Sequence, residues 1–124
     1  MSIRTSDGKT ISFSVEVATT AEQQTYGLMF RRSMPQDSGM LFIWQADQPI
    51  TMWMKNTYIP LDMLFVQKDG TITKIATHTK PFDLGLISSD GPVRGVVELN
   101  AGEAGRHGLK VGDKVLFPAF SKGS

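Results

Sequence analysis

The stretch ITMWMKNTYIPLD, residues 50–62, runs without a break into MLFVQ, residues 63–67. Alternating side chains predict a strand over its first six residues. The Asn-Thr pair and the proline that follow predict an irregular link to the next strand, which we call the crossing. The run LDMLFV, residues 61–66, is apolar on both faces beyond Asp62, which is typical of a central strand covered on both sides. Together these segments predict a β fold in which the crossing leads into a buried strand.

Strand patterns continue on both sides of this stretch. The turn KDG, residues 68–70, predicts a hairpin to the returning strand TITKIAT, residues 71–77. Before the stretch, TISFSVEV at residues 10–17 alternates apolar and polar side chains, which predicts one half-buried strand. We also expect strands at residues 39–44, 94–100 and the end of 109–117, a polar loop at 45–49, and a long irregular connection at 78–92.

Two short helices are expected. The segment TTAEQQTYGLMFRR, residues 19–32, opens with two threonines, and either can form a capping box that starts a helix of about three turns. Basic Arg31 suits the negative end of that helix dipole. Asn100, followed three residues later by Glu103, is the expected cap of a second short helix. Six to eight strands with two minor helices predict a mainly β domain, an antiparallel sandwich or partly open barrel.

Length and composition limit the class of protein further. A chain of 124 residues suits one domain, with a core expected at about residues 10–118. Its 13 basic and 12 acidic residues leave a formal charge of +1, which argues against electrostatic capture of nucleic acid. There is no cysteine, which excludes thiol chemistry, and no apolar run approaches the roughly 20 residues of a membrane span.

The crossing carries an unusual set of side chains. Strand alternation places Trp53 and Lys55 on the face opposite Ile50. Asn56 and Asp62 then bracket the loop, where short polar side chains commonly accept hydrogen bonds from free backbone amides. Asp62 is therefore either a loop brace or a desolvated carboxylate at a functional surface.

Acid–base chemistry would have to use carboxylates, because no nucleophile motif or phosphate-binding loop is present. The candidates are Asp62 and Glu98, with Lys55 or Arg31 available to stabilise negative charge. On the strand RGVVELN, residues 94–100, Glu98 shares a face with a valine and an arginine. It is expected either to pair with an arginine or to face a pocket.

Metal binding has little support in the sequence. Six methionines lie between residues 29 and 63, and thioethers can bind copper(I), but methionine is also a common filler of core gaps. His78 and His107 are far apart and show no ligand-like spacing with a partner. We expect no metal and no cofactor.

Five segments resemble the prokaryotic domain-of-unknown-function family 192. They are GLMFR at 27–31, GMLF at 39–42, MWMKNTYIPLD at 52–62, VELNAG at 97–102 and GLKVGDKV at 108–115. The resemblance implies a β-rich, jelly-roll-like fold and transfers no catalytic residues, because the family is uncharacterised. Its members often resemble exported proteins, which implies a periplasmic or exported protein after removal of a leader, or else a cytoplasmic one.

We expect a binding module rather than an enzyme. Its partner would be a small molecule or a polymer, held by an aromatic and polar surface around the crossing. The residues expected to contribute to that surface are Trp53, Lys55, Asn56, Asp62 and Arg31. A hydrolase-like enzyme that uses Asp62 and Glu98 as a carboxylate pair is one alternative, and a structural domain without a ligand is another. The sequence does not define an oligomeric state.

Overall fold

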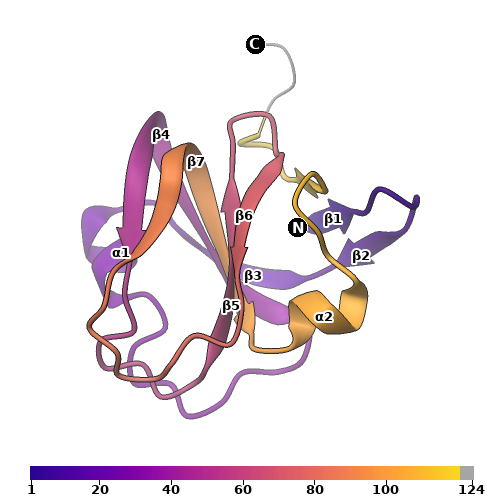
Figure 1. Ribbon diagram of the computed structural model, residues 1–124. Coiled ribbons are helices and arrows are strands. Elements are labelled where there is room, and N and C mark those ends of the chain that lie inside the picture. Colours follow the sequence, from indigo (N-terminus) through magenta and orange to yellow (C-terminus); the bar gives the residue numbers. More distant parts are fainter. Residues whose placement is uncertain (121–124) are drawn as a thin grey trace.

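Two β-sheets and two short helices make up the protein, for which the computed structural model describes residues 1–120. In chain order the elements are β1 (Ser2–Arg4), β2 (Thr10–Ser12), β3 (Ser14–Ala18), α1 (Ala21–Tyr26), β4 (Ser38–Met52), β5 (Leu61–Val66), β6 (Ile72–Ala76), β7 (Ile87–Asn100), α2 (Glu103–His107) and β8 (Lys114–Leu116). The mainly β architecture predicted from the sequence is confirmed (Figure 1).

The larger sheet has five strands in the order β3-β4-β7-β5-β6. Strands β3 and β4 are parallel, and the other neighbouring pairs are antiparallel. All six residues of β5 are buried, as expected for a strand covered on both faces. The hairpin between β5 and β6 also forms, with the amide of Gly70 donating to the carbonyl of Gln67.

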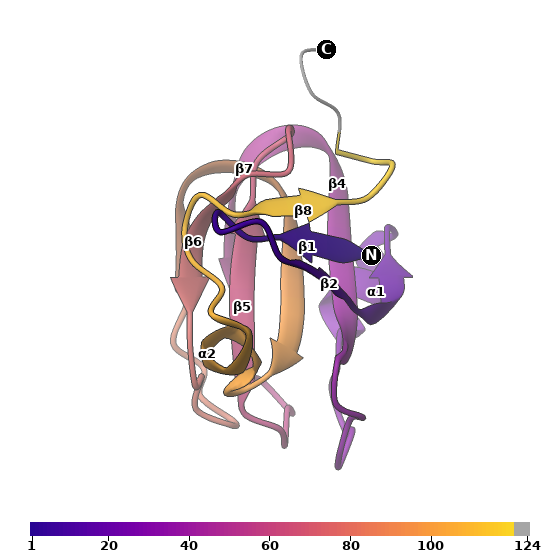
Figure 2. The same ribbon diagram turned by 90° about the vertical axis from the view of Figure 1, so that its right-hand side faces the viewer.

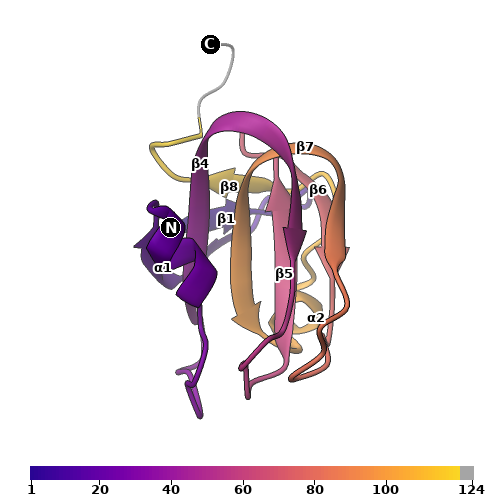
Figure 3. The same ribbon diagram turned by 90° about the vertical axis from the view of Figure 1, so that its left-hand side faces the viewer.

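The two longest strands fold over one face of this sheet. The pairing of β4 with β7 is interrupted between Ile43 and Gln48, and it resumes as far as Met52 and Ile87. Both strands bend at this interruption and return as an arch (Figures 1 and 3). We call the returning part, residues 48–52 with 87–93, the arch. A buried cluster that includes Met40, Met54 and Met63 fills this side of the sheet, so these methionines are core residues.

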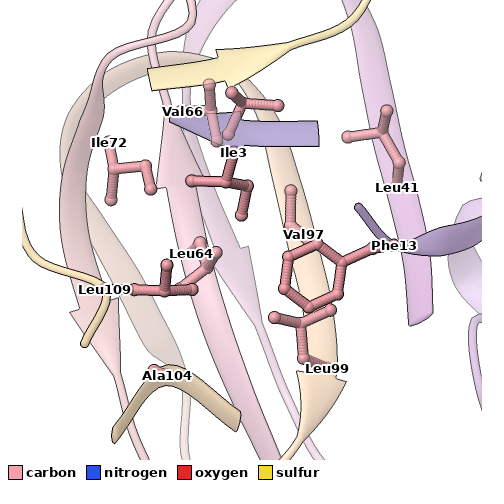
Figure 4. Packing of buried hydrophobic residues seen from close by; sticks show 11 residues of the cluster. Ile3, Phe13, Leu41, Leu64, Val66, Ile72, Val97, Leu99, Ala104 and Leu109 are labelled. Carbon is pink, nitrogen blue, oxygen red and sulfur yellow. The ribbon is translucent and has the colours of Figure 1, made fainter. Parts of the chain in front are cut away.

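A three-stranded sheet, in the order β2-β1-β8, crosses the opposite face (Figure 2). Its central strand pairs with both neighbours, and Ile3 lies opposite both Ile11 and Val115. Side chains from the two sheets and from α2 form the second buried cluster, in which Ile3 and Phe13 lie over Val97 and Leu99 (Figure 4). The domain therefore has apolar cores on both faces of its larger sheet.

Several boundaries differ from the sequence predictions. Residues 10–17 form two short strands rather than one, because Phe13 separates β2 in the small sheet from β3 in the large one. The expected loop at 45–49 lies within β4, and β7 begins at Ile87, inside the segment expected to be irregular. In both places the strands pair through the arch, a tertiary contact that local sequence does not reveal.

Both helices form, with differences at their ends. The capping box of α1 uses Thr20 and Gln23, but the helix is only six residues long and ends at Gly27, well before Arg31. Helix α2 begins after Gly102, so Asn100 is not its cap. Instead, the Asn100 side-chain amide donates to the carbonyl of Met34 at 2.9 Å. Neither helix of the described residues has the length and apolar character needed to cross a membrane.

Candidate functional site

Asp62 accepts hydrogen bonds from three backbone amides. One carboxylate oxygen accepts from His78 at 3.0 Å, and the other accepts from Gly102 at 3.0 Å and Ala104 at 2.9 Å. The last two amides belong to the start of α2, whose N-cap has no side-chain acceptor of its own. Asp62 is completely buried, so its role in the structure is to brace α2 and the chain after β6 rather than to present a carboxylate to a ligand.

The two candidate carboxylates do not form a pair. In the register of β5 with β7, Asp62 lies opposite Leu99, and Met63 lies opposite Glu98. Because neighbouring side chains in a strand point to opposite faces, Asp62 points toward α2 while Glu98 points toward the arch. The backbone of the sheet separates the two groups. The hydrolase-like alternative, which needs both carboxylates at one site, gains no support from this arrangement.

Glu98 stands out among the carboxyl groups of the protein by its burial and its surroundings. Its residue is only 4% exposed, and no hydrogen bond or ion pair to its carboxyl group is found among residues 1–120. No side-chain oxygen of these residues is both fully buried and unpaired, so the carboxyl oxygens keep some exposed surface. The expected pairing with an arginine is therefore wrong, since Arg94 pairs with Asp47 at 3.0 Å. Burial raises the pKa of Glu98 from 4.5 to about 8. At neutral pH the group is mainly an uncharged carboxylic acid.

Glu98 faces a cavity of about 230 Å³ between α1, the first bend of β4, the end of the arch and the crossing. One wall is the segment from Gln24 to Met29, and Trp53 and Lys55 come from the crossing. The residues that line it are Gln24, Thr25, Tyr26, Gly27, Leu28, Met29, Phe42, Trp44, Thr51, Met52, Trp53, Lys55, Thr57 and Glu98. Apolar and aromatic walls with a few polar groups are typical of small-molecule sites.

Aromatic side chains give the cavity its shape. The rings of Phe42 and Trp44 stack at a centroid distance of 6.2 Å. Trp53 is 40% exposed, and the ammonium of Lys55 lies 5.1 Å from the centroid of its ring. A cation this close to an indole ring makes a favourable cation–π contact, so Lys55 is held at the mouth of the cavity.

The remaining sequence candidates lie elsewhere. Arg31 forms a bidentate pair with Glu16, with one contact at 2.7 Å, and does not line the Glu98 cavity. Asn56 adopts a positive φ of 54°, and its backbone carbonyl accepts from Phe30 at 2.9 Å, so it shapes the crossing. Trp53, Lys55 and Glu98 thus line one cavity, whereas Arg31, Asn56 and Asp62 are not among its lining residues.

A second group of ionisable side chains ties α2 to the turn before β4. His107 lies 2.7 Å from Asp37 and 3.5 Å from Glu103, which could together offer three ligand atoms to a metal. Arg106 pairs with both carboxylates, however, so its guanidinium already supplies the positive charge that a metal ion would provide. We therefore interpret this group as an ion-pair network. The sequence signal that was missed is the i, i+4 spacing of Glu103 and His107.

The protein is a small, mainly β domain whose central sheet carries an apolar core on each face. The chain matches DUF192, described as uncharacterized ACR, over residues 2–117. It belongs to this family, in agreement with the resemblance seen in its sequence motifs. No protein with a curated description matches it significantly.

Two crystal structures are similar over most of their length. A proposed transcription regulator from Sinorhizobium meliloti 1021 is 46% identical, with a TM-score of 0.90 over 91% of this chain and 88% of that one. A protein of unknown function from Novosphingobium aromaticivorans DSM 12444 is 38% identical, with a TM-score of 0.89 over 94% of this chain and 82% of that one. These similarities establish the fold of the family.

Proposed function

We propose that this protein is a binding module for a small polar molecule, and that the ligand enters the Glu98 cavity. The observation that carries the proposal is the Glu98 carboxyl group, which belongs to a residue only 4% exposed, has no partner among residues 1–120 and faces a cavity with aromatic walls. No side-chain oxygen among these residues is both fully buried and unpaired, so the surface that the carboxyl oxygens keep is open to a molecule in the cavity.

The lining residues support a ligand with both apolar and polar parts. Trp44 and Trp53 offer ring surfaces, whereas Thr25 and Thr51 offer hydroxyl groups that form no side-chain hydrogen bond with residues 1–120. A cavity of about 230 Å³ has the size of a single metabolite rather than a polymer segment. The polar groups can orient a ligand, while the rings exclude water from around it.

The test is a thermal-shift screen with sugars, polyols, amino acids and organic acids. A ligand that binds only the folded state at 100 times its Kd stabilises that state by about 2.7 kcal/mol and raises the Tm. We expect at least one compound to raise the Tm of wild type, and Trp53→Ala to remove this shift while its far-UV circular dichroism spectrum stays unchanged.

Phe82→Ala is the matched control, because Phe82 is also an exposed aromatic residue of a neighbouring loop but does not line the cavity. It is expected to keep the shift. Binding that survives Trp53→Ala, or that is lost equally in both variants, would contradict the proposed site. The absence of any Tm shift at millimolar concentrations would favour a structural domain without a ligand.

A further inference from the structure

Two side chains of opposite charge type line the Glu98 cavity. Of its lining residues, Glu98 carries the one carboxyl group and Lys55 the one amino group. Glu98 is buried in the sheet at 4% exposure, whereas Lys55 is exposed at the mouth. Neither forms an ion pair with another residue of the described chain, 1–120. The cavity therefore offers one site for a cationic group and one for an anionic group.

The inner end suits an ammonium group. A buried carboxyl group without a partner gains most from a ligand cation that donates hydrogen bonds to it, since the new ion pair offsets the cost of desolvation. The aromatic lining adds to this preference, because the faces of Trp44, Trp53 and Tyr26 attract cations within about 6 Å. A neutral hydroxyl group would gain less from the same surroundings.

The outer end suits a carboxylate. Lys55 is held against the ring of Trp53 at 5.1 Å, so its ammonium is restricted in position before any ligand arrives. An anionic group at the mouth stays partly in water, where one lysine is sufficient to pair with it. Apolar surface from Leu28 and Phe42 remains for a small side chain.

From this arrangement we propose that the ligand is a zwitterion of the size of a small amino acid, with its ammonium group on Glu98 and its carboxylate group on Lys55. The inference rests on the binding function proposed above. The volume of about 230 Å³ is sufficient for a molecule of this size. Glu98 loses its proton to solvent when the ammonium group binds, so the complex holds two ion pairs and has no excess charge.

Isothermal titration calorimetry tests the proposal with matched sets of probes. Each set contains one L-amino acid, the amine that lacks its carboxylate and the acid that lacks its ammonium group, and a separate set contains neutral sugars and polyols. We expect an amino acid to bind at least tenfold more tightly than its amine or its acid. The measured enthalpy is expected to change with the ionisation enthalpy of the buffer, because binding releases the Glu98 proton.

Two variants test which group of the ligand each charged side chain binds. Glu98→Gln is expected to weaken amino-acid binding at least tenfold and to remove the dependence on the buffer. Lys55→Met is expected to abolish the preference for the amino acid over its amine. The control Lys80→Met changes an exposed lysine that does not line the cavity, and it is expected to bind as wild type does.

The outcomes separate this inference from the proposed function. If only neutral compounds bind, and Trp53→Ala abolishes that binding, the small-molecule site stands and the zwitterion inference is wrong. If amino acids bind equally well to wild type, Glu98→Gln and Lys55→Met, the assignment of the two charged groups is also wrong. If no probe of any set binds, both proposals fail.

Discussion

The ionisation of Glu98 should make the stability of the protein depend on pH in an unusual direction. Its pKa is raised from 4.5 to about 8 by burial, so the folded state binds this proton more tightly than the unfolded chain. The stability that protonation provides is therefore fully present below about pH 4.5 and is lost as the pH rises through about 8. An ordinary ion-paired carboxylate would show the opposite sign.

The magnitude follows from the two pKa values. Each unit of difference between the folded and unfolded pKa corresponds to about 1.4 kcal/mol over the pH range that lies between them. From pH 5 to pH 8, Glu98 alone is expected to lower the free energy of unfolding by about 3–4 kcal/mol. Glu98→Gln keeps the size and hydrogen-bonding capacity of the uncharged acid, so it should have nearly the wild-type stability at pH 5 and exceed it at pH 8.

Urea denaturation at several pH values, followed by far-UV circular dichroism, measures this difference. Subtracting the wild-type curve from that of Glu98→Gln removes the contributions of all other ionisable groups. Glu22→Gln is the control, because Glu22 is exposed and should give a curve parallel to wild type. Parallel curves for Glu98→Gln and wild type would refute the reasoning, since they would mean that the carboxyl group ionises normally in the folded state.

The remaining predictions concern stability and are checked by the same denaturation assay. Asp62→Ala leaves three backbone amides without their acceptor and should cost about 3 kcal/mol or more, and a loss below 1 kcal/mol would contradict the bracing role. Gly39→Ala should cost several kcal/mol, because its Cβ would lie 2.2 Å from the carbonyl oxygen of Glu98, whereas Gly105→Ala in α2 meets nothing within 4 Å and should stabilise by about 0.5–1 kcal/mol. Thr20→Ala removes the capping box of α1 and should cost about 1 kcal/mol, and an unchanged midpoint would mean that the helix does not need its cap.

The parts of the fold that the sequence predicted well are those set by local chemistry. The apolar run 61–66 can be satisfied only where both faces are covered, and it became the fully buried β5. The turn at 68–70 and the capping box at Thr20 depend on residues next to one another in the chain, and both formed. Alternation also placed Val96 and Glu98 on one face of β7 and Val97 on the other.

The features that the sequence did not predict depend on which element covers each face of the large sheet. Strand β7 lies between β4 and β5, and that order decides that Asp62 meets α2 whereas Glu98 meets a cavity. The position of Asp62 beside the crossing indicated a possible bracing role, but nothing local indicates which element or cavity either carboxyl group meets. The separation of Arg31 from the cavity has a similar origin, since the early end of α1 at Gly27 redirects the chain.

The pairing of β1 with β8 has a consequence for how the protein is made. Ile3 is fully buried on β1, the central strand of the small sheet. Its neighbour β8 lies near the end of the described chain. During synthesis at about 5–20 residues per second, the first strand waits roughly ten seconds before its partner has been made. Until then Ile3 and the core face of the large sheet lack their cover.

Folding therefore cannot be completed on a partly made chain, and the domain must acquire its native state after residues 114–116 have left the ribosome. A nascent chain that stalls before this point would expose an apolar sheet face, which chaperones and proteases recognise. Closure of this core therefore requires β8, whose pairing with β1 covers Ile3.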